Sequence, residues 1–196
     1  DGDAMAEPGR VATLPDTLRG LVAARLDDLS AAQRSVLQDA SVIGQRGPMM
    51  GLREMGRQLR QGVDIDAAIA DLVADEIMEV DGELWSFRSD LVREVAYQTI
   101  TKAERAKCHL GIAAFIERKA ADVDPRPPWV VDQLAHHYGA AVALASELGP
   151  NARTDAFPAD LAARARRWVT EAADRARRDQ AQPASVRLYT QALDLL

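Results

Sequence analysis

The histidines of this chain and its single cysteine are the side chains best suited to metal chemistry. Cys108 is followed directly by His109. The other two histidines, His136 and His137, are also adjacent. Imidazole nitrogens and thiolates are ligands that Zn²⁺ prefers, but neighbouring side chains on a helix point about 100° apart and make a poor chelate. We therefore predict no metal site, and we interpret Cys108 as a small core residue rather than a nucleophile.

A catalytic site is not predicted either. The glycine-rich stretch 44–51 could form a phosphate-binding loop, but such a loop needs Lys-Ser or Lys-Thr directly after its last glycine, and Leu52 and Arg53 follow instead. The pattern predicts a loop that leads into a helix of moderate quality over 45–62. No set of acid, base and nucleophile converges in the sequence, so we expect the chain not to be an enzyme.

The stretch 61–87 has no lysine or arginine but is rich in carboxylates. These are Asp64, Asp66, Asp71, Asp75, Glu76, Glu79, Asp81 and Glu83. Phosphate contacts supply most non-specific affinity for DNA, and these carboxylates would repel the DNA backbone. We expect this surface to contact a basic face of another protein, with Asp71, Asp75 and Glu76 as the candidate partner-binding residues. The formal net charge of −6 is likewise not that of an obvious nucleic-acid binder.

Six arginines, by contrast, are dense near the C-terminal end. They are Arg164, Arg166, Arg167, Arg175, Arg177 and Arg178. Glu171, Asp174 and Asp179 are interleaved with them, which is typical of a solvated helix face. The alternative is a basic strip that docks an acidic partner.

A β-hairpin between Ile77 and Phe87 is the most specific local pattern. Two apolar runs flank Asp81-Gly82. Asp-Gly is a preferred two-residue turn because both turn positions need φ > 0. Alternating side chains in the two runs predict one buried and one exposed face.

Helical spacing on both sides of the hairpin predicts a mainly α-helical chain. Ser30 with Gln33, and Thr101 with Glu104, have the spacing of capping boxes, and Gly44 could end a helix in the left-handed region. The predicted apolar stripes include Leu18, Leu21, Val22, Leu26 and Leu29 in the first helix and Val186, Tyr189, Leu193 and Leu196 in the last. A hairpin between helices is the layout of a winged helix.

Four regions follow from these patterns. Residues 1–13 form a flexible lead-in, and 14–123 form a winged-helix domain with a C-terminal linker helix. The Pro-rich linker 124–128 separates this domain from a helical segment, 129–196, because closely spaced prolines cannot continue a helix. Helical hairpins with small residues at their crossings resemble the start of a tetratricopeptide-repeat array.

Several short motifs occur in an order that points to a family. Residues 87–97 are Phe-Arg-Ser-Asp-Leu-Val-Arg-Glu-Val-Ala-Tyr, and 103–106 are Ala-Glu-Arg-Ala. Leu-Pro-Asp-Thr-Leu at 14–18 lies upstream, and Leu-Ala-His-His-Tyr at 134–138 lies downstream. Together they resemble the segment after the nucleotide-binding module in STAND proteins, signal-transduction ATPases with numerous domains. Within that class, the motifs are most similar to those of the bacterial proteins in which this segment is attached to class III adenylate cyclases or LuxR-type regulators.

This resemblance implies a non-catalytic regulatory segment that acts through protein–protein contacts. The implied partners are the chain's own upstream ATPase core, which would bind ATP or ADP, and downstream sensor repeats; no cofactor is expected in the segment itself. The effector would be an adenylate cyclase or a transcription factor. The alternative is a DNA-binding winged-helix regulator.

The family's winged helix commonly supplies a histidine to bound ADP. If the Phe-Arg-His segment makes this contact, the matching position here is Ser89. Serine can donate a hydrogen bond but cannot carry the charge of histidine. Ser89 as a plain helix N-cap, followed by an amphipathic helix, is the structural alternative.

The composition sets the remaining bounds. Hydrophobic residues make up 47% and charged residues 28% of the chain, as in ordinary globular proteins. One cysteine permits no internal disulfide. No apolar run approaches the roughly 20 residues that span a bilayer, and no signal peptide is visible. We expect a cytoplasmic protein that does not contact membranes.

Overall fold

The computed structural model describes residues 16–60, 62–148 and 157–195 of the chain. Within these ranges the protein is mainly α-helical, with nine helices and one three-stranded antiparallel sheet. The helices are α1 (Asp16–Asp27), α2 (Ala31–Ile43), α3 (Met49–Leu59), α4 (Ile65–Ala74), α5 (Asp90–Thr99), α6 (Lys102–Lys119), α7 (Pro128–Ser146), α9 (Leu161–Arg178) and α10 (Gln182–Leu193). The strands are β1 (Arg46–Pro48), β2 (Met78–Asp81) and β3 (Leu84–Phe87). The predicted mainly α class is confirmed, whereas the predicted lead-in at 1–13 lies outside the described residues.

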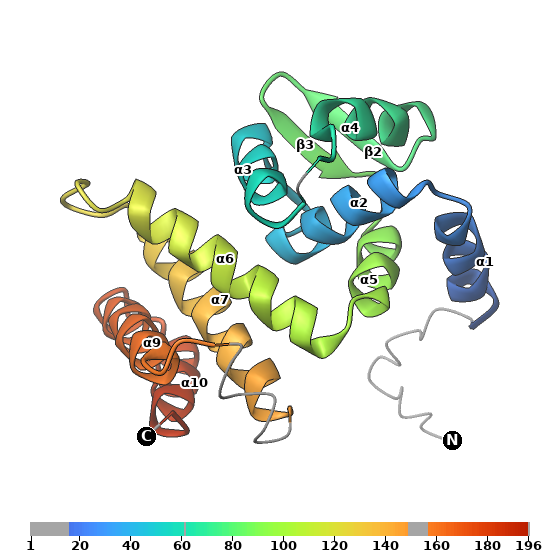
Figure 1. Ribbon diagram of the computed structural model, residues 1–196. Helices are drawn as coiled ribbons and strands as arrows, with labels where there is room; N and C mark the ends of the chain where they lie inside the picture. The colour runs from blue at the N-terminus through green and yellow to red at the C-terminus, as the bar shows by residue number, and fades with distance from the viewer. Residues whose placement is uncertain (1–15, 61, 149–156, 196) are drawn as a thin grey trace, which may run out of the picture.

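Two groups of elements meet along one long helix. Figure 1 shows the sheet with α1 to α5 at one end of the molecule and α7, α9 and α10 at the other. The helix α6 runs between them. We call the first group the N-terminal unit and the second the helical hairpins.

The sheet has one strand more than the predicted hairpin. Its order is β1-β3-β2, and both pairings are antiparallel. The extra strand β1 lies in 45–62, where a loop before a helix is predicted; the helix is present as α3, but part of the loop is a strand. Gly47 lies opposite Trp85, and a Cβ on Gly47 would lie 3.0 Å from Cζ2 of Trp85, so glycine leaves room for the indole. Three residues are too few to produce an alternating pattern.

The hairpin of β2 and β3 is confirmed, with its turn shifted by one residue. Asp81 pairs with Leu84, so Gly82 and Glu83 form the loop. Gly82 has φ 57°, while the two non-glycine residues with positive φ lie elsewhere in the chain. The prediction that Asp81 and Gly82 both adopt φ > 0 is therefore wrong. A two-residue turn with glycine at its first position needs φ > 0 only there.

The helix α2 is the centre of the N-terminal unit. Its capping box forms as predicted: Ser30 Oγ accepts from Gln33 N at 3.2 Å, and Gln33 Oε1 accepts from Ser30 N at 2.9 Å. Val36 and Leu37 are buried in the core that α4 and the sheet complete. Gly44 ends the helix, but its φ of 152° with ψ −164° lies outside the predicted left-handed helical region.

Close contact between α3 and α4 depends on a glycine. A Cβ on Gly56 would lie 2.3 Å from Cδ1 of Ile65, so a larger residue would push the two helices apart. Asp64 caps α4, its carboxylate accepting from Ala67 N at 3.0 Å.

The predicted apolar stripes of the terminal helices α1 and α10 are buried only in part. In α1, Leu26 is buried, but Leu18 and Leu21 are 40% and 68% exposed. In α10, Ser185 and Ala192 face the core, and Val186 and Leu193 are 63% and 65% exposed. Both stripes are apolar, yet only part of each meets a neighbouring element within the described chain.

The C-terminal helices pack as consecutive hairpins, as predicted. Helix α7 packs against α6 on one side and α9 on the other, and α10 packs against α9. Tyr138 and Trp168 are almost fully buried between them. Small residues lie at the crossings and let the helices approach closely; they include Ala113, Ala141, Ala165, Ala172 and Ala173.

Helix α6 is buried on two sides. Cys108 and Ile112 join a cluster with Val42 of α2 and Ile100 after α5. Other side chains of α6, including Ala113, belong to the core of the helical hairpins. The segment 124–128 connects α6 to α7, which pack along each other, so α6 belongs to both groups. The division into domains at 124–128 stays a prediction.

A buried ion pair holds α2, the end of α3 and α6 together. The Asp39 side chain is 1% exposed, and Arg60 donates to its two carboxylate oxygens at 2.9 and 3.2 Å. Cys108 Sγ lies 3.9 Å from the same carboxylate. Burial raises the pKa of Asp39 while Arg60 opposes the rise, and the guanidinium is what makes an ionised carboxylate tolerable there.

Replacing Arg60 with methionine should lower the free energy of unfolding by about 3 kcal/mol, because Asp39 would stay buried without its partner. The matched control is Arg57→Met, since Arg57 pairs with Glu54 at the surface, and such pairs contribute about 0–1 kcal/mol. Urea unfolding followed by circular dichroism measures both changes. Equal losses in the two variants would show that the buried pair does not stabilise this junction.

Candidate functional site

Two arginines outside the stretch 61–87 neutralise part of the acidic surface of the N-terminal unit. Arg53 of α3 pairs with Asp66 at 2.9 Å and lies 3.6 Å from Glu83. Arg88, directly after β3, pairs with Glu79 at 3.1 Å and lies 3.7 Å from Glu76. All eight carboxylates of 61–87 are exposed, and two arginines neutralise only part of their charge, so the surface stays acidic.

The three candidate partner-binding residues have different roles. Asp71 on α4 is exposed, and within the described residues its side chain makes no ion pair or hydrogen bond. Asp75 ends α4, and its carboxylate accepts from Gln33 Nε2 at 2.8 Å. Glu76 follows with a positive φ of 55°. Among the three, Asp71 is therefore the carboxylate that is exposed to solvent and has no partner within the described residues.

Ser89 caps α5, as the structural alternative predicts. Its side chain accepts from Leu91 N at 3.2 Å, and its backbone has the extended conformation of an N-cap. Leu91, Val95 and Ala96 then form the buried face of α5. A contact between Ser89 and a nucleotide stays a prediction.

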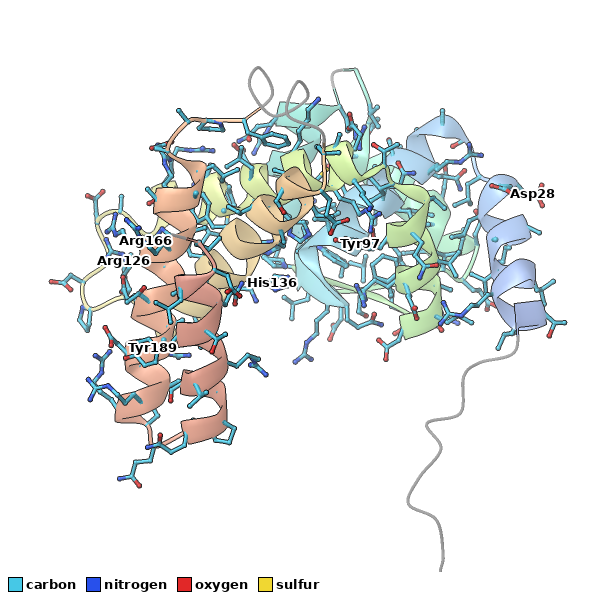
Figure 2. The ribbon with its side chains drawn as sticks, turned by 90° about the horizontal axis from the view of Figure 1, so that it is seen from below. Asp28, Tyr97, Arg126, His136, Arg166 and Tyr189 are labelled. Carbon is cyan, nitrogen blue, oxygen red and sulfur yellow. The ribbon has the colours of Figure 1, made fainter. Side chains whose placement is uncertain are left out.

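The structure brings together the three histidines of the chain. His109 lies on α6, and His136 and His137 lie on α7; one ring nitrogen from each lies within 4.8 Å of the others. Side chains adjacent in sequence make a poor chelate, but here three side chains from two different helices meet, so the spacing within one helix does not exclude a metal site. Figure 2 shows His136 and Tyr97 in the middle of the molecule, between α1 on one side and α9 and α10 on the other.

A signal for this cluster was present in the sequence. Positions 109 and 137 are equally far from residue 123, which directly precedes the Pro-rich segment 124–128. Two helices that fold back on each other about that point place 109 opposite 137. The register of a predicted helical hairpin, rather than spacing within one helix, would have found it.

The two buried histidines form part of a continuous hydrogen-bonded chain. His109 Nε2 lies 3.1 Å from the Tyr97 hydroxyl, His109 Nδ1 lies 2.8 Å from His137 Nδ1, and His137 Nε2 lies 3.2 Å from Gln133 Oε1. Because the Gln133 oxygen only accepts, His137 donates from Nε2 and accepts at Nδ1. His109 then donates from Nδ1 and accepts from Tyr97 at Nε2, so both nitrogens of each buried imidazole have a hydrogen-bond partner.

Burial keeps both of these imidazoles neutral. It lowers the pKa of His109 to about 3, with a smaller effect from His136 and Arg105. It also lowers the pKa of His137 well below the ordinary value. The cluster is therefore a set of neutral nitrogen donors and acceptors near neutral pH.

An apolar cavity of about 560 Å³ adjoins the histidines. It lies between β1 and α3 on one side and α6 and α7 on the other, and His137 and Gln133 form part of its wall. Two of its lining side chains, Trp129 and Met50, are apolar and yet 60% and 52% exposed. Its volume is in the range of small-molecule sites.

Part of the C-terminal arginine group is engaged within the fold. Arg167 lies 4.7 Å and Arg126 5.6 Å from the ring of the buried Trp168. Arg164 pairs with Asp160 at 2.7 Å, and Arg175 pairs with Asp132. This arrangement agrees with a solvated, internally paired face. The docking strip stays a prediction.

Comparison of the chain with protein-family models, with curated proteins and with solved structures finds no match. None of the helices in the described ranges has both the length and the apolar composition needed to cross a bilayer.

Cys108 should be unreactive in the folded protein. It is 1% exposed, and burial raises the pKa of its thiol to about 12, so the thiolate is scarce at neutral pH. We expect reaction with a disulfide reagent to be at least on the order of 100-fold slower in the native chain than in urea. Cys108 is the single cysteine, so absorbance of the released thiol reports it alone. Equal rates in buffer and in urea would contradict its burial.

The buried histidines should make the fold less stable at acidic pH. Their folded-state pKa lies below the unfolded value of about 6.5, so the unfolded chain binds more protons as the pH falls. The free energy of unfolding should be constant above about pH 7 and should fall below about 6.5, by up to about 1.4 kcal/mol per pH unit for each imidazole. Urea unfolding between about pH 7.5 and about pH 5 measures this slope. His109→Gln should reduce this slope by the contribution of one proton, up to about 1.4 kcal/mol per pH unit. An unchanged slope would contradict the low folded-state pKa of His109.

Proposed function

We propose that this chain is a non-catalytic regulatory segment of a STAND-type ATPase that acts through protein–protein contacts. In its N-terminal unit the element order α2, β1, α3, α4, β2, β3 supports a winged helix, in which the β2–β3 hairpin would be the wing. The consecutive hairpins of α6, α7, α9 and α10 would be the start of a tetratricopeptide-type array. Both features agree with the motif order in the sequence.

The burial of α6 on two sides is the observation that carries the proposal. A rigid helix shared by two packed groups can pass a displacement of one group to the other, because packed interfaces change between discrete arrangements rather than deform continuously. Lys102 at the start of α6 pairs with Glu147 at the end of α7. Tyr138 of α7 donates to Glu117 of α6 at 2.5 Å. The wing and the repeats would therefore respond together.

The acidic surface directs the proposal toward a protein partner. In the proposed winged helix, α4 would hold the position of the recognition helix. It carries Asp66 and Asp71 and no basic residue. A basic face of the upstream ATPase core, in the cytoplasm, is the partner that this charge favours. The core would hold ATP or ADP, and sensor repeats would follow downstream.

Asp71→Lys should weaken binding to the ATPase core about tenfold, which corresponds to about 1.4 kcal/mol, because it replaces an attraction by a repulsion. Fluorescence anisotropy of the labelled chain, titrated with the core, measures the affinity. Asp122→Lys is the matched control, since Asp122 is also exposed but lies in the connection after α6.

A mobility shift with duplex DNA separates the two candidate functions. We expect no shift at physiological salt, because α4 would face the phosphates with carboxylates. A shift that Asp71→Lys strengthens would favour the DNA-binding regulator.

In the anisotropy titration, Asp71→Lys and Asp122→Lys give a second test. If both variants change the affinity for the ATPase core equally, α4 is not the docking surface.

A further inference from the structure

The histidine cluster has a second feature that the fold does not require. His109 and His137 direct their Nδ1 atoms toward each other, 2.8 Å apart, and the ring of His136 lies within 5.7 Å of both other rings, measured between centroids. Three histidines in 196 residues thus converge at a single point between two helices. A hydrogen bond between two side chains would need no third imidazole.

The outer nitrogen of each buried ring lies within hydrogen-bonding distance of an oxygen, as the outer nitrogen of a metal-bound histidine does. A metal-bound histidine commonly bonds through its other nitrogen to an oxygen of the protein, which fixes the orientation of the ring. Here the Tyr97 hydroxyl lies 3.1 Å from His109 Nε2, and Gln133 Oε1 lies 3.2 Å from His137 Nε2. Both Nδ1 atoms are left pointing into the space between the rings.

The separation of the two buried Nδ1 atoms suits an ion after a small adjustment, whereas His136 must move closer, since the three nearest ring nitrogens are spread over up to 4.8 Å. Two nitrogens bound to a tetrahedral Zn²⁺ at about 2.0–2.1 Å lie roughly 3.3–3.4 Å apart. The two Nδ1 atoms would therefore separate by roughly half an ångström as the ion replaces their shared proton. That proton moves to His109 Nε2, from which it is donated to the Tyr97 oxygen, so the buried pair stays neutral and loses no proton overall.

The donor set selects the class of metal. Three neutral imidazoles suit Zn²⁺ or Cu²⁺, whereas Mg²⁺ and Ca²⁺ require oxygen ligands. The guanidinium of Arg105 lies 4.8 Å from the centre of the Tyr97 ring and would repel a cation. The affinity would therefore have to come from the bonds between nitrogen and metal. His136 is exposed, so the third ligand stands on the solvent side, where a fourth position is open to water.

We propose that His109, His136 and His137 form a Zn²⁺-type metal site with an open fourth position, which joins α6 to α7 beside Tyr97 of α5. The proposal uses only this cluster and does not depend on the proposed regulatory function. The ion would fix the junction at which the N-terminal unit meets the helical hairpins.

Titration of tag-free protein with Co²⁺ and then Zn²⁺ tests the site. We expect one Co²⁺ per chain, with the intense visible absorption of a tetrahedral ion, and loss of that absorption when one equivalent of Zn²⁺ is added. His136→Ala should weaken Zn²⁺ binding at least tenfold in calorimetry and leave the circular dichroism unchanged, because His136 is exposed. Asp132→Ala is the control, since Asp132 lies one turn before His136 on α7; it should leave the affinity unchanged.

Imidazole nitrogen shifts in ¹⁵N-labelled protein identify the ligating atoms without any mutation of the core. Zn²⁺ should move the Nδ1 signals of His109 and His137. The proposal is overturned if neither ion binds, if His136→Ala binds as tightly as the unmodified chain, or if Zn²⁺ moves only Nε2 signals. Each of these results would leave the histidines as a hydrogen-bonded chain alone.

Discussion

The two-sided burial of α6 is the constraint on which the rest of the structure depends. One side of the helix meets α2, α3 and the end of α5, and the other completes the core of the hairpins. A helix with one buried face can slide or rotate at the cost of one interface, but α6 would have to repack two cores at once. The ion pair of Asp39 and Arg60, in contact with Cys108, adds a polar requirement at the same place. Buried charges that are paired stabilise little over an apolar core, yet they make every unpaired arrangement costly.

Local physical chemistry explains why much of the fold was predictable. The capping box of Ser30 and Gln33 and the cap at Ser89 depend on residues within a few positions of one another. The strand β1 depends instead on a partner about 40 positions later in β3, so its own residues carry no pattern. The predicted stripes of α1 and α10 are buried only in part for a related reason. Periodicity identifies which side of a helix is apolar, but only the tertiary structure decides how much of that side finds a partner.

The candidate sites divide in the same way. The charge of the acidic stretch is a property of composition, and the structure alters it only by adding Arg53 and Arg88 at its edge. The histidine cluster is a property of register, because it exists only when α6 and α7 align about residue 123. Reasoning within single helices could not combine His109 with His137. The cavity beside them was inaccessible to sequence reasoning altogether, since its walls come from β1, α3, α6 and α7.

The junction is also where buried polar groups concentrate. Asp39, His109 and His137 are at most 3% exposed, and all three lie on α6 or the helices that flank it. Unpaired, each would cost more stability than a typical hydrogen bond contributes, so displacing α2, α5, α6 and α7 relative to one another is costly unless these groups find new partners. His137 and Gln133 also line the apolar cavity, so the network and the cavity share a wall. A change in either therefore acts on the same side chains, and through them on the helix that both halves of the protein share.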